Sequence, residues 1–577
     1  MADMTAGGYV PLRRSQGTVS LEGAVLILAA LYIGVFALFP LTRLLWEAFS
    51  AGKSGEPLGL LLDQWKSPST QRALWHTIEV SVLSVIVSVI LGTGIALAIV
   101  LTDVRAKALA TFTLMLPMLI PPQITALAWV ELMAPSSALM SLFGLAAEPG
   151  TTNPLYSREG IILVMGIEHA PLVYLAIRAG LNSVPSDLVE SARLAGAAPG
   201  RVLWSIILPL MVPAILAGIT LSFISSIANF GTPAVLGIPG RYPVLTTLIY
   251  QRLQGFGASA LGETAALSLI LAVLAIIGLA IRAWLAGRMA SKTDMSSARF
   301  QGFSLGVWRM PVSTILWSLL MVISILPLVA LFSASISKAI GVPLDFVTAT
   351  LDHYRLVLSS EAVVRAFSNS FMLAIITSVA SISIALPIAY FAAVRQRPFA
   401  RALEMIADLP YAVPGTVVAI GVILVLLRPL PLIQVSLYGT MGILVFAYLA
   451  RFLSLGLRPV IAGAELLDKA IDEAGQMAGA HVFRRIRSII LPVLAPAAAA
   501  GALLIFMAAF NELTVSALLW SSGNETIGVS IFMFHYEGNS PAANALACLA
   551  LAVTIGLALI ISLFGRYLPE GAIPWRA

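Results

Sequence analysis

Charged side chains and cysteines are scarce in this sequence. Only 11% of its residues are charged, whereas soluble domains carry roughly 25%. A chain that is 59% hydrophobic could not keep its apolar surface from water as a set of soluble domains. The single cysteine, Cys548, excludes an intrachain disulfide. The composition therefore favours an integral membrane protein.

Motifs of catalytic proteins are absent as well. No G-x-x-x-x-G-K-[ST] phosphate loop occurs, because Gly52-Lys53-Ser54 has Glu47 where that motif needs its first glycine. The five histidines are dispersed, without H-E-x-x-H or a Cys/His cluster. No nucleophile–base arrangement is recognisable. We therefore expect no catalytic residue, no metal site and no ATP hydrolysis by the chain alone.

Long uncharged runs are what the chain has in abundance. A helix needs roughly 20 apolar residues to cross about 30 Å of hydrocarbon. Residues 24–41 and 267–281 meet this need without a charge. We predict twelve spans, near residues 22–45, 74–102, 108–134, 160–180, 206–236, 263–286, 311–335, 363–394, 402–427, 437–457, 489–520 and 541–564. The expected fold class is an all-α polytopic membrane protein.

Basic residues are distributed unevenly among the predicted loops. About two thirds of the Lys and Arg residues fall on one side of the membrane if the N-terminus is inside. Because Lys and Arg accumulate in cytoplasmic loops, both termini are expected in the cytoplasm. The net charge of +6 then matches anionic lipid headgroups. The basic residues are scattered over short loops, which argues against nucleic acid as a partner.

One set of landmarks occurs twice. The segment ESARLAG at 190–196 precedes Leu208-Pro209, and EAGQMAG at 473–479 precedes Leu491-Pro492 at the same spacing, 283 residues later. Asn229 and Asn511 follow the two copies, and LPMLIPP and LPYAVPG precede them. This order predicts two parallel six-helix repeats, residues 1–295 and 296–577, related by an axis along the membrane normal.

Each copy lies in a predicted cytoplasmic loop, the first motif loop (181–205) or the second motif loop (458–488). Good helix formers interrupted by glycine favour a short helix along the membrane surface, with Gly196 and Gly479 permitting a sharp turn. The Ile-x-Leu-Pro ending puts Pro209 and Pro492 in the first turns of the next span, where a missing N–H costs least. An ordinary loop would not need the same spacing twice.

The pattern Glu-Ala-Ala, three residues, Gly, nine residues, Ile-x-Leu-Pro resembles the signature of permease subunits of ABC importers with the type I fold. Ser191 and Gly475 replace alanines of that pattern, but both are small. The resemblance implies a fused chain whose two motif loops act as coupling helices for an ATPase. The residues that it implicates are Glu190, Ala192, Gly196, Leu208, Pro209, Glu473, Ala474, Gly479, Leu491 and Pro492.

The same resemblance implies partners and a location. Two copies of a cytoplasmic ATP-binding subunit would bind ATP and magnesium, so that this chain needs no cofactor of its own. A solute-binding protein would deliver the substrate from outside. The chain itself would be a multi-pass protein of the bacterial inner membrane, in contact with lipid.

The substrate is indicated less sharply. Residues 229–237 and 511–519 are similar to the ferric-iron permease group, which implies ferric iron as the cargo. Phosphonate, thiamine and polyamine permeases share related phrases and stay as alternatives. A gradient-driven secondary transporter would match the twelve-span topology, and a channel is a further class, but neither explains the repeated loop.

Polar residues inside predicted spans are candidates for the translocation path, because charge at bilayer depth is costly. Asn229, Asn511 and Glu512 are such candidates, and the rival interpretation is a packed hydrogen bond that bends the helix. Glu168 and His169, like Glu131, are expected near the outer ends of their spans. There they would reach water by snorkelling and have a structural role.

Overall fold

Helices make up all regular secondary structure in the part of the chain that the structure describes. This computed structural model describes residues 21–564 except 51–54, 57, 147, 149, 256–258, 290–301, 343, 346 and 430–433. The predicted all-α class is confirmed. The predicted boundary between the halves, at 295/296, lies outside the described residues, as do both chain ends.

The helices follow one another in a similar order in the two halves. Those of the first half are α1 (Leu21–Tyr32), α2 (Phe39–Ala48), α3 (Gly59–Lys66), α4 (Pro68–Leu101), α5 (Lys107–Leu119), α6 (Pro122–Met133), α7 (Ala138–Leu142), α8 (Arg158–Leu181), α9 (Ser186–Leu194), α10 (Pro199–Val202), α11 (Leu208–Ala228), α12 (Leu245–Leu253) and α13 (Ala260–Met289). Those of the second half are α14 (Arg309–Leu320), α15 (Leu326–Ser335), α16 (Asp352–Ser359), α17 (Glu361–Ala389), α18 (Pro398–Ala407), α19 (Leu409–Ala412), α20 (Gly415–Leu426), α21 (Met441–Glu465), α22 (Lys469–Met477), α23 (Val482–Arg485), α24 (Leu491–Phe510), α25 (Ser516–Leu519), α26 (Ile527–Tyr536) and α27 (Ser540–Phe564).

The predicted number of spans agrees with the structure. Among the described residues, 11 helices are long and apolar enough to cross a membrane, or up to 12 if a bent pair counts as one span. That pair, Pro398–Ala412 and Gly415–Leu426, is bent by 103°. In the first half α5 and α6 are likewise separate helices, joined at Ile120 and Pro121. The predicted spans 108–134 and 402–427 are therefore each broken into separate helices, because proline offers no N–H to carry a helix through these points.

Two further spans end earlier than predicted. The span predicted at 206–236 runs from Pro199 to Ala228, and the span predicted at 489–520 runs from Phe483 to Phe510. Asn229 and Asn511 are the first residues beyond these helices. The apolar run continues past both points, so hydropathy alone could not locate the ends. The two asparagines consequently lie where helices stop, rather than within them.

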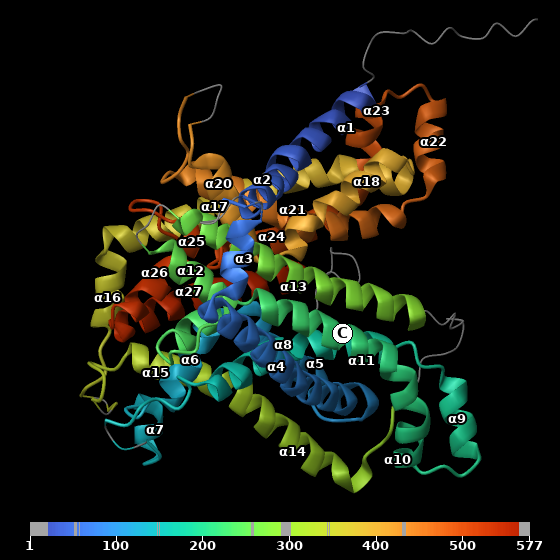
Figure 1. Cartoon of the computed structure of the whole chain (residues 1–577). Coiled ribbons are helices and arrows are strands. Elements are labelled where there is room, and N and C mark those ends of the chain that lie inside the picture. Colours follow the sequence, from blue (N-terminus) through green and yellow to red (C-terminus); the bar gives the residue numbers. More distant parts are fainter. Residues whose placement is uncertain are drawn as a thin grey trace, which may run out of the picture.

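The first long helix of each half packs against the other half. Helices α1 and α2 pack against α17, α18, α20 and α21, and the Tyr32 hydroxyl donates a 2.8 Å hydrogen bond to the carbonyl oxygen of Leu449. Helices α14 and α15 pack against α4, α5 and α6. Figure 1 shows α1 beside α18, and α14 beside α4 and α5. The two sequence repeats are therefore interlocked in space.

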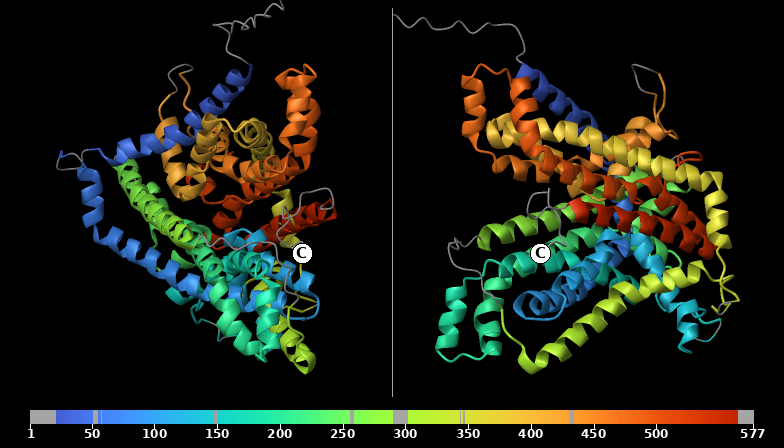
Figure 2. Two further views of the ribbon diagram at one scale, coloured as in Figure 1. Left: turned by 90° about the vertical axis from the view of Figure 1, so that its right-hand side faces the viewer. Right: turned by 180° about the vertical axis from the view of Figure 1, so that it is seen from behind.

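The two motif loops project from the same end of the molecule (Figure 1 and Figure 2), with α9 and α10 in one and α22 and α23 in the other. At the opposite end helices of the two halves pack together, α6 against α15 and α26, and α12 against α20 and α25. The sequence predicts both motif loops on the same side of the membrane. Their position at one end of the molecule agrees with that expectation.

Candidate functional site

The two motif helices, α9 and α22, end in the same backbone turn. Gly196 has a φ of 83° and Gly479 a φ of 77°. The N–H of Ala197 bonds to the carbonyl of Ala192 at 3.0 Å, and the N–H of Ala480 to that of Gly475 at 3.1 Å. Each turn is a Schellman motif, which favours glycine because other residues avoid positive φ. The sharp turn predicted at both glycines is confirmed.

Matched side chains stand on the exposed face of these helices. Glu190 and Glu473 are both exposed. The apolar side chain four residues further on is almost fully exposed in each copy, 90% for Leu194 and 88% for Met477. Each motif helix thus presents a carboxylate and a large apolar side chain on its exposed face. Ala192 is half-buried on this element and Ala474 is exposed.

The Leu-Pro pairs do not join this surface. Leu208 and Leu491 follow a π-helical turn, in which their N–H groups bond to the carbonyls of Leu203 and Ile486, five residues earlier. Pro209 and Pro492 are then near the starts of α11 and α24, as the missing N–H predicts. The π-turns re-aim the chain as each motif loop enters its span, so these residues shape the loop rather than its exposed face.

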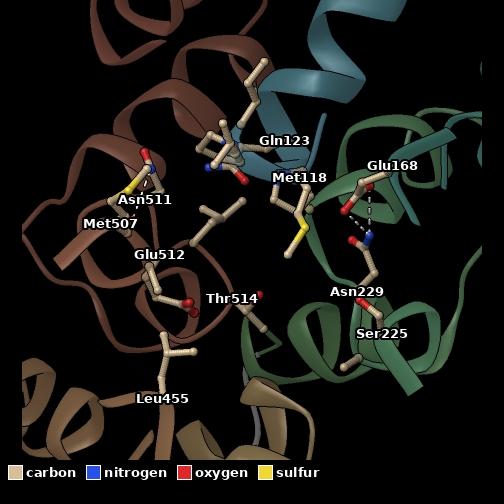
Figure 3. Close-up of a pocket in the computed structure, with 18 of the residues that line it drawn as sticks. Met118, Gln123, Glu168, Ser225, Asn229, Leu455, Met507, Asn511, Glu512 and Thr514 are labelled. Carbon is tan, nitrogen blue, oxygen red and sulfur yellow. Dashed lines mark hydrogen bonds between the residues drawn. The ribbon is translucent and has the colours of Figure 1, made fainter. Parts of the chain in front are cut away.

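A cavity of about 420 Å³ lies between the two halves. Apolar side chains form much of its wall, and the first half contributes the break between α5 and α6. Figure 3 shows Glu168 and Asn229 on one side and Asn511 and Glu512 on the other. The polar lining residues are Gln123, Glu168, His169, Ser225, Asn229, Tyr411, Arg451, Asn511, Glu512 and Thr514.

On the first-half wall, Glu168 is fixed by neutral hydrogen-bond donors. The Asn229 amide donates to both of its carboxylate oxygens, at 3.0 and 3.1 Å, and the Thr232 hydroxyl donates at 2.9 Å. The neighbouring His169 ring bonds through Nδ1 to the Ser226 hydroxyl at 3.0 Å. Both Glu168 and His169 are buried. Asn229 therefore lines the cavity and also orients a carboxylate within it.

On the second-half wall, the carboxylate of Glu512 lies near a charged side chain, whereas Glu168 has neutral donors. One Glu512 oxygen accepts the N–H of Val515 at 2.7 Å, and the other lies 3.9 Å from Arg451 Nε. Asn511 does not touch this carboxylate and instead bonds to Thr554 of α27 at 3.2 Å. Asn229 and Asn511 are thus equivalent in sequence and in placement, while their partners differ.

Sequence reasoning misplaced Glu168 and His169. They were expected to snorkel near the outer end of the fourth span, but α8 begins at Arg158 and both lie well inside it. Ten residues of helix place Glu168 about 15 Å from that end, too far to reach water along the helix. Its partner Asn229 is 61 residues away in sequence, so no local pattern could have indicated the contact. Glu131, by contrast, lies near the end of α6, as expected.

Three aromatic rings join the halves beside the cavity. Phe230 lines the cavity, and its ring centroid lies 5.4 Å from Tyr250 of α12 and 6.1 Å from Phe532 of α26. Tyr250 and Phe532 meet edge to face at 5.8 Å. All three are buried, and α12 and α26 lie at the end away from the motif loops (Figure 1). We call Phe230, Tyr250 and Phe532 the aromatic plug.

The residues around the cavity do not form a resident metal site. Within the described ranges, no three His, Cys, Asp or Glu side chains gather closely enough to hold a metal ion. The two cavity carboxylates belong to different walls, each with its own partners. The cavity therefore has polar groups on both walls within a mostly apolar lining.

A family model matches the chain twice. It is described as "Binding-protein-dependent transport system inner membrane component", and it covers residues 72–291 and 385–570. These two matches include both motif loops and both sets of cavity residues. The repeat deduced from the sequence is therefore a repeat of this family's unit.

Three proteins with similar sequences are named permeases. The chain is 25% identical over 549 residues to a probable ABC transporter permease protein, y4fN, of Sinorhizobium fredii (strain NBRC 101917 / NGR234), covering 93% of this chain and 95% of that protein. It is 24% identical over 556 residues to the ferric transport system permease protein FbpB of Actinobacillus pleuropneumoniae, covering 96% and 79%. The molybdenum transport system permease protein ModB of Escherichia coli (strain K12) is 31% identical over 223 residues, covering 37% of this chain and 93% of that protein.

Proposed function

Because this chain belongs to the family of binding-protein-dependent transport system inner membrane components, we propose that it supplies both transmembrane halves of an ATP-driven importer for ferric iron. The pair of motif loops at one end of the molecule carries this proposal. Each presents a carboxylate and an exposed apolar residue on a helix closed by the same glycine turn. Two identical ATP-binding subunits would each find one such surface.

In this proposal the chain's role is mechanical. The motif loops face the cytoplasm, where closure of two ATP-binding subunits on ATP would draw α9 and α22 together. The α11 and α24 spans continue directly from these loops, so the movement would reach the cavity. A nearly complete switch requires ATP to favour one conformation by about 5.5 kcal/mol. Hydrolysis belongs to the partner, since this chain has no phosphate loop.

The charge of the cavity supports a cation as cargo. Glu168 and Glu512 supply two carboxylates against the single guanidinium of Arg451. Hard cations such as ferric iron prefer oxygen ligands. By formal charge this lining is net negative, which would disfavour an anionic cargo. The name of FbpB, a relative that matches 96% of this chain, points to ferric iron among the possible cations.

Reconstitution with its partners tests the proposal. Purified alone, the chain is expected to show no ATPase activity above background. With the ATP-binding subunit and an iron-loaded binding protein in vesicles, radioactive iron should enter only when ATP is present. A proton ionophore should leave uptake unchanged. Uptake that needs a proton or sodium gradient, or hydrolysis without a second subunit, would contradict the proposal.

The aromatic plug is expected to close the outer end of the cavity. Phe532→Ala removes one of three mutually packed rings, and such a loss typically costs 3–5 kcal/mol in a packed core. In a Cys548→Ala background with Met507→Cys in the cavity wall, a membrane-impermeant thiol reagent added from outside should label at least ten times faster in this variant. Phe399→Ala, which truncates an exposed ring on α18, is the control. An unchanged labelling rate would show that the plug is not the barrier.

A further inference from the structure

The two motif loops are anchored to the body of the protein by different chemistry. In the first loop, Val189 and Val202 are completely buried. The residues 283 positions later are Asp472 and Arg485, which are also buried, at 1% and 4% exposure. Arg485 Nε donates to Asp472 Oδ1 at 3.0 Å. Two buried valines beneath one motif helix thus correspond to an ion pair beneath the other.

The ion pair extends beyond the second loop. The Tyr390 hydroxyl, at the end of the α17 span, lies 3.1 and 3.0 Å from the two Asp472 oxygens. Arg395 Nη1 lies 3.5 Å from Asp472 Oδ2, and Arg485 Nη1 donates to the carbonyl of Ala480 at 3.3 Å, in the turn that closes the motif helix. The carboxylate is therefore held from three directions.

Glu22 connects this group to the first helix of the chain. Its carboxylate lies 3.9 Å from Arg395, 3.4 Å from Arg397 and 4.0 Å from Arg485. Glu22 is in the first turn of α1, the helix that packs on the second half although it belongs to the first. We call the connected set the latch cluster, and it consists of Glu22, Tyr390, Arg395, Arg397, Asp472 and Arg485.

The first loop has a weaker counterpart. The segment before α14 is fixed to the connection between α4 and α5, where the N–H of Leu305 donates to Asp103 at 2.9 Å and lowers the pKa of that carboxyl. The same segment before α14 contacts the first motif loop at Arg193, whose guanidinium lies 6.0 Å from the Phe303 ring. A cation–π contact at an exposed site contributes about 0.5–1 kcal/mol and fixes little direction.

Stability alone does not account for the latch cluster. Replacing a buried ion pair by apolar residues of similar volume is often neutral or stabilising, by about 1–4 kcal/mol. The first loop demonstrates that valines fit beneath a motif helix of this design. What charged hydrogen bonds add is a defined geometry between the groups that they join. Here those groups belong to α1, to the end of α17 and to α22.

We propose that Glu22, Asp472 and Arg485 are positioning residues that make α1 and the second motif helix move as one body. Displacement of α22 would then reach α1 directly, and through α1 the faces of α17 and α18 on which α1 packs. The first motif helix acts through its own span without this second connection. The two loops would therefore contribute unequally to transport. This inference rests on the proposed function, because it assigns a consequence to the displacement that a partner would cause.

One variant copies the first loop into the second. Asp472→Val with Arg485→Val introduces the buried valines of the first loop, Val189 and Val202, at the matching positions. Glu22→Gln leaves the Asp472–Arg485 bond in place and removes the connection to α1. Spin labels in a Cys548→Ala background, at the exposed positions Ile27 on α1 and Met477 on α22, report the distance between the two helices. Labels at Leu194 and Val307 report the first loop as a control.

Both variants are expected to broaden the Ile27–Met477 distance distribution, to leave the Leu194–Val307 distribution unchanged, and to lower transport per ATP hydrolysed at least threefold in the assembled complex. Glu465→Gln, an exposed carboxylate at the end of α21, should change neither measurement. Wild-type distributions and wild-type coupling in both variants would overturn the inference. If the valine variant fails to fold, Glu22→Gln decides alone. The distances are measured on the chain itself, so failure of the wild-type complex to hydrolyse ATP would count against the proposed function only.

Discussion

Replacing Glu190 and Glu473 together by alanine is expected to reduce recovery of the ATP-binding subunit with this chain, and substrate uptake, at least tenfold. Both carboxylates are exposed on matched helices and are free to meet basic groups of a partner. A hydrogen bond to a charged group contributes about 1.5–3 kcal/mol, so that losing one at each site exceeds a factor of ten. Co-purification from detergent and uptake into vesicles measure the two effects.

Two neighbouring carboxylates are the controls for this pair. Asp187 lies on α9 three residues before Glu190 and is exposed, and Glu465 is exposed at the end of α21. Alanine at these positions should leave both measurements within a factor of two. If the double motif variant also binds and transports normally, the glutamates do not mediate coupling, and the exposed Leu194 and Met477 become the contacts to test.

Neutralising the buried carboxylate of the cavity is the second change with a large expected effect. Glu168→Gln should lower iron uptake at least tenfold while recovery of the ATP-binding subunit stays normal. In its ionised form this carboxylate attracts a passing cation more strongly at low dielectric than it would in water. Uptake into vesicles and co-purification, measured side by side, separate a fault in the passage from a fault in docking.

Glu159→Gln is a matched control for this variant. Glu159 is in the first turn of the same helix, exposed and paired with Arg158 at 2.8 Å, so its neutralisation should change uptake little. Normal uptake by Glu168→Gln would contradict a role in the passage and restore the structural interpretation. Higher uptake of an oxyanion by the variant would instead count against a cation as cargo.

Features that the sequence predicted are those fixed by short segments of chain. Apolar runs located the long spans because a hydrocarbon interior demands about 20 such residues. The spacing of 190–196 and 473–479 predicted the paired turns, because a left-handed residue favours glycine whatever surrounds it. The segments LPMLIPP and LPYAVPG served as landmarks of the repeat, and the structure shows that the helix breaks at both of them.

Features that the sequence could not predict depend on contacts between distant segments. Glu168 is polar, and hydropathy placed it at a water interface, since nothing near it in sequence indicates the Asn229 and Thr232 donors. From the sequence, Asp472 and Arg485 would be expected to be exposed charges of a surface loop. Their burial follows from the approach of Tyr390 and Glu22, which are 82 and 450 residues away from Asp472 in the chain.

Because the first helices of each half pack on the other half, the protein cannot complete its packing in the order in which it is synthesised. The surfaces that receive α1 and α2 belong to α17, α20 and α21, so they are synthesised more than 300 residues later. Helix α2 can meet α13 of its own half earlier, but until the second half is made α1 lacks α17 and α18, the helices on which it packs. Long-range contacts of this kind slow folding and favour partly assembled states. A ribosome stalled after the first half would leave α1 unassembled, and quality-control proteases of the membrane would meet the chain in that form.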